Sequence, residues 1–215
     1  MPGTVFIDRD GVICENRSDY VKSWREFVFL PNALQALVAL HQNGYQVIVV
    51  TNQSAVGRGL ISLETLFDIH TRMAAEVERH GGHIEQIFFC THCPNENCYC
   101  RKPRPGMLLA AAQMLNIDLT TSYIIGDACT DIQAGQAVRC RSFLVLTGRG
   151  LAQLPATFLH ATTTFHVVSD LEAAVEHILN NGWRADSADD SLTLKAGQTL
   201  PVPSLTGFPD ALYRL

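Results

Sequence analysis

Short apolar runs alternate with segments of helical apolar spacing along this chain, and the alternation restricts the possible folds more than any other feature. The predicted strands span residues 4–8, 46–51, 84–90, 122–127, 142–146 and 165–169, and the predicted helices span residues 32–43, 62–80, 106–115, 130–138 and 171–180. Strands that alternate with helices form a parallel sheet, because each helix returns the chain to the end where the next strand begins. The pattern therefore predicts an α/β fold: a three-layer, Rossmann-like parallel sheet with helices on both faces.

All of these predicted elements lie within residues 1–180, a length typical of one domain. The connections after the first and second predicted strands are too short for a further folded unit, so we expect no separate cap domain. Residues 181–215 contain turn residues and no helical period, and we interpret them as a C-terminal tail of unassigned role. The tail side chains available to pack on the domain are Trp183, Leu200, Phe208 and Tyr213.

The composition excludes several classes of function. Hydrophobic residues make up 47% of the chain, enough for a sizeable core, and charged residues make up only 17%, too few for a disordered polar chain. The net charge of -5 provides no broad basic face for nucleic acid, and no apolar stretch is long enough to cross a bilayer. Asp8, Arg9 and Asp10 interrupt the N-terminal region where a signal peptide needs an apolar run. We therefore predict a cytoplasmic protein with no nucleic-acid or membrane partner, and we expect a monomer.

Carboxylates lie at the ends of two of the predicted strands. Asp8 and Asp10 end the apolar run in "TVFIDRDGV", and Asp127 ends "SYIIGD". Residues i and i+2 of a strand face the same side, and two charges placed together are unfavourable without a cation or a proton. Because ligands of such sheets bind beyond the carboxyl ends of the strands, we expect these groups to meet there. The oxygens of Asp8, Asp10 and Asp127 suit Mg²⁺, a hard cation.

Donors and cations accompany these carboxylates. Thr51 and Asn52 lie at the end of the second predicted strand, and Arg101 and Lys102 precede a predicted helix in "CRKPRPGM". A hydroxyl, an amide and two cations suit the oxygens of a phosphate. A lone D-x-D-G is more often a turn or a cation-binding loop, but the whole set at strand ends predicts phosphoryl transfer. One aspartate would attack phosphorus and the other would transfer the proton; the pairing alone does not say which attacks.

A dense group of cysteines lies between the third predicted strand and the two cations. The stretch "CTHCPNENCYCRKP" presents Cys90, His92, Cys98 and Cys100, and three thiolates with one imidazole suit a filled tetrahedral Zn²⁺ site. Cys93 is an alternative ligand, and a group of reduced surface cysteines is the alternative to a metal site. The chain has seven cysteines, an odd number that argues against a disulfide framework. We expect zinc to order the loop and thereby to position the two cations.

These motifs resemble those of the haloacid dehalogenase-like phosphatases. The matching segments are "DRDGV", "TNQS", the region of Lys102 and "GDACTD", in the family's order. The resemblance implies that Asp8 is the nucleophile and that Asp10 is the general acid and base. It also implies that Thr51 and Lys102 hold the phosphoryl group.

The resemblance also bears on the last of these motifs. It implies that Asp127 completes the Mg²⁺ site. Asp131 would orient a metal-bound water or hold the loop. Alternatively, Asp131 simply caps the helix that starts near Thr130.

Two stretches indicate a branch of the family. "TNQSAVGRGLIS" and "CRKPRPGM" resemble the heptose bisphosphate 7-phosphatases more than the related histidinol-phosphate phosphatases, which share the zinc loop. The resemblance implies a small sugar phosphate, D-glycero-D-manno-heptose 1,7-bisphosphate, as substrate. The alternatives are histidinol phosphate, a broad range of small phosphomonoesters, or a zinc-stabilised binding module without catalysis. Ala55 and Ala128 depart from the branch, which typically has glycine and often lysine at these positions.

Arg58 suits the second phosphate of a bisphosphate, because a guanidinium binds phosphate through two hydrogen bonds; the alternative is a structural salt bridge. The resemblance also implies sugar contacts from the segment that follows the first motif. The predicted catalytic residues are Asp8, Asp10, Thr51, Arg101 and Lys102. The predicted substrate-binding residues are Asn16, Asp19, Tyr20, Thr51, Asn52, Gln53, Ser54, Arg58, Arg101 and Lys102.

Overall fold

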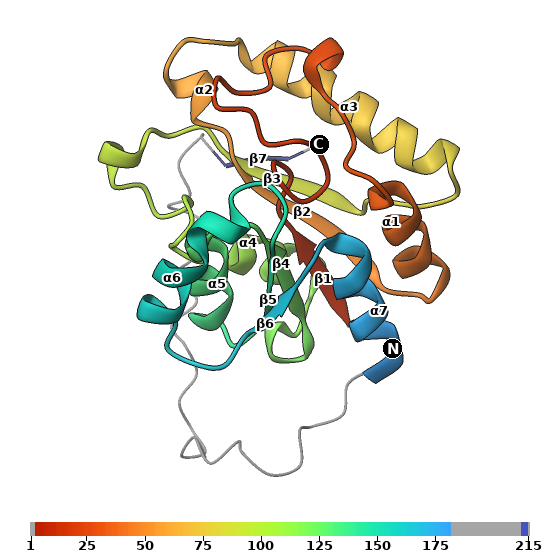
Figure 1. Ribbon diagram of the computed structural model, residues 1–215. Helices are drawn as coiled ribbons and strands as arrows, with labels where there is room; N and C mark the ends of the chain where they lie inside the picture. The colour runs from red at the N-terminus through yellow and green to blue at the C-terminus, as the bar shows by residue number, and fades with distance from the viewer. Residues whose placement is uncertain (1–2, 182–211, 215) are drawn as a thin grey trace.

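The computed structural model of the protein describes residues 3–181 and the backbone of residues 212–214. Its centre is a seven-stranded sheet in the order β6-β5-β4-β1-β2-β3-β7 (Figure 1). The strands are β1 (Thr4–Ile7), β2 (Gln46–Asn52), β3 (Gln86–Cys90), β4 (Tyr123–Gly126), β5 (Arg141–Val145), β6 (His166–Val168) and β7 (Leu212–Arg214). Strands β1 to β6 are parallel, and β7 pairs antiparallel with β3.

The central strands are continuous apolar runs because both of their faces are covered. Val5, Phe6 and Ile7 of β1 have no exposed surface. Val5 and Ile7 belong to one hydrophobic cluster and Phe6 to the other, as the alternation of strand side chains requires. The sheet therefore separates two cores.

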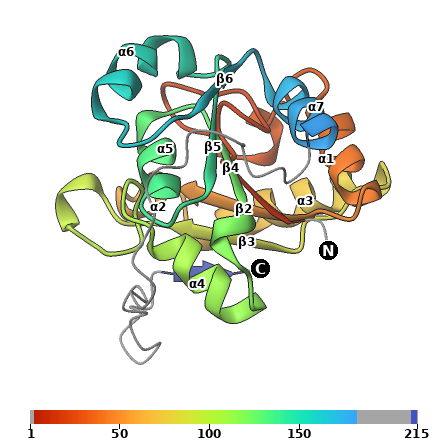
Figure 2. The same ribbon diagram turned by 90° about the horizontal axis from the view of Figure 1, so that it is seen from below.

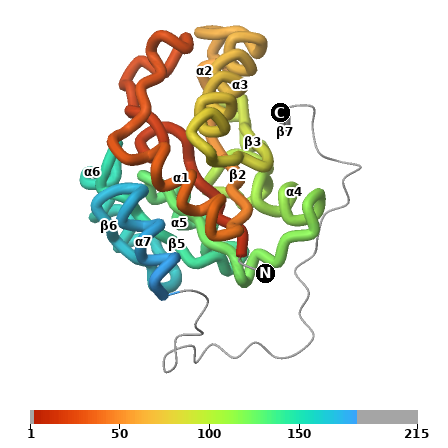
Figure 3. The backbone as a smooth tube through the Cα atoms, turned by 90° about the vertical axis from the view of Figure 1, so that its right-hand side faces the viewer, coloured from red at the N-terminus to blue at the C-terminus, as the bar shows by residue number. Residues whose placement is uncertain are grey.

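Helices cover both faces, which confirms the predicted three-layer fold. One face carries α1 (Ala33–Gln42), α3 (Leu63–Arg79) and α7 (Leu171–Asn181), and the other carries α4 (Gly106–Leu115) and α5 (Cys129–Gln136). Figure 2 shows these two groups on opposite sides of the sheet, and Figure 3 views the molecule from the side of α1, α3 and α7. The remaining elements are α2 (Ser54–Gly57), α6 (Gly150–His160), which packs on α5, and the 3₁₀ turns η1 (Trp24–Glu26), η2 (Pro94–Glu96) and η3 (Leu119–Thr121).

Helix α6 and strand β7 are among the elements that the sequence did not predict. Helix α6 contains Pro155, and Leu151, Phe158 and Leu159 on it are exposed, so it lacks the buried apolar stripe by which helices are recognised. Strand β7 comes from the predicted tail and pairs with the edge of β3.

The predicted domain ends at residue 180, and α7 ends one residue later, at Asn181. The predicted packing of Trp183, Leu200, Phe208 and the Tyr213 side chain lies outside the described residues. Within the described residues, no helix combines the length and the apolar character that crossing a membrane requires.

The strand order places a switch in direction at the centre of the sheet. From β1 the chain adds β2 and β3 on one side, and then β4, β5 and β6 on the other. Ligands of doubly wound sheets bind at such a switch, beyond the carboxyl ends of the strands. Asp8 directly follows β1 and Asp127 directly follows β4, so both lie at this point.

Candidate active site

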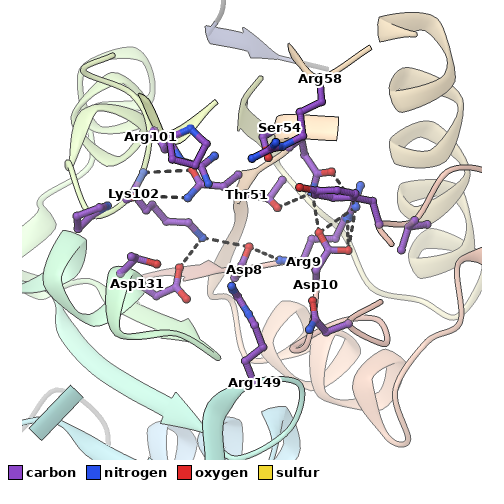
Figure 4. A pocket seen from close by; sticks show the side chains of 18 of the residues that line it. Asp8, Arg9, Asp10, Thr51, Ser54, Arg58, Arg101, Lys102, Asp131 and Arg149 are labelled. Atoms are coloured by element: carbon purple, nitrogen blue, oxygen red, sulfur yellow. Dashed lines mark hydrogen bonds and ion pairs between the residues drawn. The ribbon is translucent and has the colours of Figure 1, made fainter. Parts of the chain in front are cut away.

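A cavity of about 640 Å³ opens beside the carboxyl ends of the central strands. Its lining includes Asp8, Asp10, Thr51, Lys102 and Asp131, which Figure 4 shows from close by. The strand-end residues that the sequence singled out therefore meet at one place.

Three buried carboxylates lie close together at this site, and two of them, Asp8 and Asp131, line the cavity. Oxygens of Asp8, Asp127 and Asp131 lie within 4.8 Å of one another, and the three residues are 6%, 0% and 1% exposed. Burial raises the pKa of Asp127, with a further contribution from Asp8, while Arg149 acts in the opposite direction. Burial also raises the pKa of Asp131, to about 7, although Lys102 opposes the effect. Carboxylates in such a group are ionised together only beside positive charge.

Lys102 supplies part of that charge. Its Nζ atom lies 3.0 Å from Asp8 Oδ1 and 2.5 Å from Asp131 Oδ1, and it donates a hydrogen bond of 2.7 Å to the carbonyl of Val50. Burial alone would lower the pKa of Lys102, but Asp131 and Asp8 outweigh it and raise the pKa. The ammonium is therefore held charged, 3% exposed, between the first and the last of the predicted motifs.

Asp131 has the capping role that the sequence offered, and it also faces Lys102. Helix α5 begins at Cys129, and Asp131 Oδ2 accepts a hydrogen bond of 3.0 Å from the backbone N–H of Ala128. Its Oδ1 atom pairs with Lys102. The side chain thus caps the helix and also belongs to the carboxylate group.

The loop after β5 encloses Asp127, and sequence reasoning missed it. The backbone N–H of Arg149 donates to Asp127 Oδ2 at 2.8 Å, and its Nη2 donates to Oδ1 at 3.1 Å. A Cβ atom added at Gly11 or Gly148 would lie 2.1 or 2.4 Å from Asp127 Oδ2, so only glycine allows both loops to approach this carboxylate. Thr147 Oγ1 joins the two loops by donating to the carbonyl of Gly11. Ligands of such sheets bind beyond the carboxyl ends of the strands, and this rule, applied to β5, could have identified the segment.

Asp10 lies apart from the carboxylate group. Arg9 Nη2 donates to both Asp10 oxygens at 2.9 Å, and Gln53 Nε2 donates to Oδ2 at 2.7 Å. These donors hold the Asp10 side chain on the other side of the cavity floor. The structure therefore groups Asp131, and not the side chain of Asp10, with Asp8 and Asp127, which differs from the predicted Mg²⁺ ligands.

The end of β2 and the residues that follow it hold other side chains of the site in place. Asn52 exchanges two hydrogen bonds of 3.1 Å with the backbone of Lys102, and the Gln53 amide donates to Thr51 Oγ1 at 2.9 Å. Ser54 and Arg58 line the cavity. The amides of Asn52 and Gln53, predicted to bind substrate, are thus already engaged in positioning other site residues.

The predicted sugar-binding segment is divided by the structure. Asn16 and Tyr20 line the cavity, whereas Asp19 is not among its lining residues. The Asp19 carboxylate instead forms ion pairs with Arg17 and Lys22. All the other predicted catalytic and substrate-binding residues line the cavity.

Four side chains of the cysteine loop converge as predicted. The Sγ atoms of Cys90 and Cys100 are 3.2 Å apart, and each lies 3.6 Å from Cys98 Sγ. His92 Nδ1 lies 3.5 Å from Cys90 Sγ and 3.4 Å from Cys100 Sγ. A tetrahedron around zinc with Zn–S bonds of about 2.3 Å has edges of about 3.8 Å, so this donor set fits Zn²⁺ with a small expansion. Cys93, the alternative ligand, is outside the group.

The cysteine loop is linked directly to the cavity. Arg101 follows Cys100 in the chain, and its Nη1 atom donates to the carbonyl of His92 at 3.1 Å. Because Lys102 is the next residue, the position of both cations depends on how this loop is held.

Comparison with known proteins agrees with this geometry. A curated D-glycero-beta-D-manno-heptose-1,7-bisphosphate 7-phosphatase of Pseudomonas aeruginosa is 37% identical over 175 residues, which cover 81% of this chain and 97% of the relative. The enzyme of the same name from Bordetella bronchiseptica is 38% identical over the same shares. The chain belongs to the HAD-like phosphatases.

Other comparisons place this HAD-like phosphatase in the same family. Residues 99–174 match the family described as HAD-hydrolase-like. The crystal structure of D,D-heptose 1,7-bisphosphate phosphatase from B. bronchiseptica, complexed with magnesium and phosphate, superposes with a TM-score of 0.80 at 36% identity. The superposition covers 83% of this chain and 99% of the B. bronchiseptica chain. The predicted family, fold and phosphatase activity are thereby confirmed.

The residues of this HAD-like phosphatase also fit the metals that the sequence predicted. Three buried carboxylates offer the hard oxygen ligands that Mg²⁺ prefers. Three thiols and an imidazole gathered at one point offer the ligands of a structural zinc site. The hydrogen bond with Cys100 and burial raise the pKa of Cys90, so a cation is needed for these sulfurs to ionise together.

Proposed function

We propose that this HAD-like phosphatase removes the 7-phosphate of D-glycero-D-manno-heptose 1,7-bisphosphate. The observation that carries the proposal is the joint presence, in one cavity, of a buried reaction centre at Asp8 and Lys102 and a guanidinium at its rim, on Arg58. Arg58 makes no ion pair with the described part of the chain, which favours a ligand role over a structural salt bridge. The names of the relatives support the same substrate.

The position of the side chains supports the roles that the family resemblance implies. A carboxylate oxygen of Asp8 attacks phosphorus, the bond from phosphorus to the sugar oxygen breaks, and Asp10 gives a proton to that oxygen. Water then attacks the phosphorus of the aspartyl-phosphate, Asp10 takes the proton, and phosphate leaves with Asp8 restored. Lys102 and Thr51 hold the phosphoryl oxygens, because both line the cavity beside Asp8.

Asp8, Asp127 and Asp131 are the residues that would hold Mg²⁺. Bound there, the ion supplies the positive charge that allows an anionic nucleophile to approach an anionic phosphate. We also propose that Cys90, His92, Cys98 and Cys100 bind a structural zinc ion. Metal analysis of the purified protein tests this directly, and it should find one zinc per chain. The monomeric state and the cytoplasmic location stay predictions.

A substrate panel tests the proposal. The panel contains the α and β anomers of the heptose bisphosphate, histidinol phosphate and fructose bisphosphate, each assayed for released phosphate with Mg²⁺ present. We expect the highest kcat/KM for a heptose bisphosphate, and none of the activity to remain in Asp8→Asn. A preference for histidinol phosphate would refute the substrate, and equal activity of Asp8→Asn would refute the mechanism.

A further inference from the structure

We propose that His70, on α3 and not among the residues lining the cavity, is a positioning residue for Asp10 and acts on it through Arg9. The inference rests on the proposed function, in which Asp10 transfers the proton. It concerns a residue that neither the motifs nor the cavity lining would bring to attention.

The contact chain starts with a completely buried guanidinium. Arg9 is 1% exposed, and its Nη1 atom lies 3.0 Å from His70 Nε2. At the opposite edge of the guanidinium, Nη2 donates to both oxygens of Asp10 at 2.9 Å, and Nε lies 3.3 Å from Asp10 Oδ1. A guanidinium is rigid and planar, so the contact that fixes one nitrogen also fixes the direction of the others.

The chemistry of the two groups determines how His70 takes part. Arginine can only donate, so His70 Nε2 must accept and the ring hydrogen must be on Nδ1. Burial and the charge of Arg9 lower the pKa of His70 well below its ordinary value, which agrees with a neutral ring. His70 therefore acts as the acceptor that a buried Arg9 requires on its far side.

The rest of the His70 ring makes no other polar contact among the described residues. His70 has no exposed surface, and its Nδ1 atom has no hydrogen-bond partner among the described residues. The ring otherwise packs edge-on against Phe89, at 5.3 Å between centroids, as an apolar side chain would. A polar ring with an unmet donor is unfavourable in a core, so packing alone does not account for histidine here.

The position of Arg9 also affects Gln53, the second residue that donates to Asp10. Besides its bonds to Asp10, Arg9 Nη2 donates to Gln53 Oε1 at 3.0 Å. The Gln53 amide in turn donates to Asp10 Oδ2 and to Thr51 Oγ1. A guanidinium that tilts for lack of its acceptor on α3 would therefore move the Asp10 carboxylate, while Asp8 and Lys102 keep their own contacts.

The experiment compares His70→Leu, which removes the acceptor, with His70→Gln, which supplies an amide oxygen in its place. The matched control is Ile69→Val, a substitution at the neighbouring, equally buried position of α3. Each variant is assayed for kcat/KM on an alkyl phosphate, whose leaving oxygen needs a proton, and on p-nitrophenyl phosphate, whose leaving group hardly needs one. Because kcat/KM reports the steps up to release of the leaving group, the ratio of the two values isolates proton donation.

We expect His70→Leu to lose about tenfold in kcat/KM on the alkyl phosphate and much less on p-nitrophenyl phosphate. His70→Gln should recover most of the loss, and Ile69→Val should leave the ratio unchanged. Equal losses on the two substrates, or a His70→Gln variant no better than His70→Leu, would overturn the inference. If thermal unfolding shows that His70→Leu does not fold, His70→Met replaces it, since methionine fills the space without a nitrogen or oxygen acceptor.

Asp10→Asn separates this inference from the proposed function. It should show the same bias against the alkyl phosphate more strongly than His70→Leu does. An Asp10→Asn variant without the bias would contradict the proposed role of Asp10 itself. A bias in Asp10→Asn with none in His70→Leu would overturn only the role of His70.

Discussion

The Nζ atom of Lys102 lies 3.0 Å from Oδ1 of Asp8, and both side chains are almost completely buried. Asp131 completes the arrangement from the other side of the ammonium. One buried cation thus serves carboxylates that lie far apart in the sequence. This arrangement links the stability of the site to its chemistry, because removing the cation leaves buried negative charge without compensation.

We expect Lys102→Met to reduce kcat about 100-fold, because a donor to the phosphoryl oxygens is lost. The same change should lower the free energy of unfolding by about 3 kcal/mol without Mg²⁺, since Asp8 and Asp131 are left unpaired. Phosphate-release assays and urea unfolding measure the two effects. The control is Lys22→Met, which removes an exposed ion pair with Asp19 and should change stability by no more than about 0.5 kcal/mol. Activity of Lys102→Met within twofold of the unaltered protein would contradict the role of Lys102.

The cysteine loop offers a matched pair of substitutions. Cys98→Ser removes a member of the four-residue group, whereas Cys93→Ser changes a cysteine of the same loop outside it. We expect Cys98→Ser to lose its zinc and part of its activity, because the loop that positions Arg101 and Lys102 is no longer held. Cys93→Ser should keep both. Metal analysis and phosphate release are the measurements, and full activity of a folded, zinc-free protein would show that zinc does not position the cations.

Arg149 should weaken the binding of Mg²⁺, because its guanidinium already neutralises Asp127. We therefore expect Arg149→Ala to bind Mg²⁺ several-fold more tightly, on the order of 1 kcal/mol, since the Arg149 side chain is half-exposed and its charge partly screened. Arg149→Lys keeps the charge and should bind the ion about as the unaltered protein does. Isothermal titration with MgCl₂ gives both affinities. Weaker binding by Arg149→Ala would mean that Arg149 helps to hold Asp127 for the metal instead of competing with it.

The buried ring of His70 makes stability depend on pH. Burial and Arg9 depress the pKa of His70 in the folded state, whereas an unfolded histidine titrates near about 6.5. Below that pH the unfolded chain binds a proton that the folded ring does not, so the contribution of His70 is present above pH 6.5 and is lost as the pH falls. The slope is about 1.4 kcal/mol per pH unit for one proton.

This dependence can be measured with His70→Gln, in which the titrating ring is absent. Urea unfolding at pH 7.5 and pH 5 should show that the unaltered protein loses about 1.5 to 2 kcal/mol more than His70→Gln over this range. The control His160→Gln removes an exposed ring and should leave the pH dependence as it is. Parallel pH profiles of the unaltered protein and His70→Gln would show that His70 is not held neutral.

Much of the fold could be predicted because its signals are local. The buried run Val5–Ile7 and the helical apolar spacing of α3 reflect the periods of the elements themselves, two and 3.6 residues. The lack of a buried apolar stripe on α6 explains why that helix was missed, and Pro155 added to the difficulty. Strand β7 was missed because its pairing with β3 depends on a partner more than a hundred residues away.

The sequence alone determined which chemistry was available: the strand-end carboxylates at Asp8 and Asp127, the lysine beside the cysteine loop, and the four zinc-type ligands. Each of these signals is a residue type at a short spacing in the sequence. Residues at a short spacing stay near one another whatever fold the rest of the chain adopts.

Only the tertiary structure decided which of these side chains contact one another. It turned the Asp10 carboxylate toward Arg9, brought Asp131 to Lys102, and set His70 behind them from 61 residues away. The physical reason is that a buried charge needs its partners wherever packing places them, and packing is a property of the whole chain.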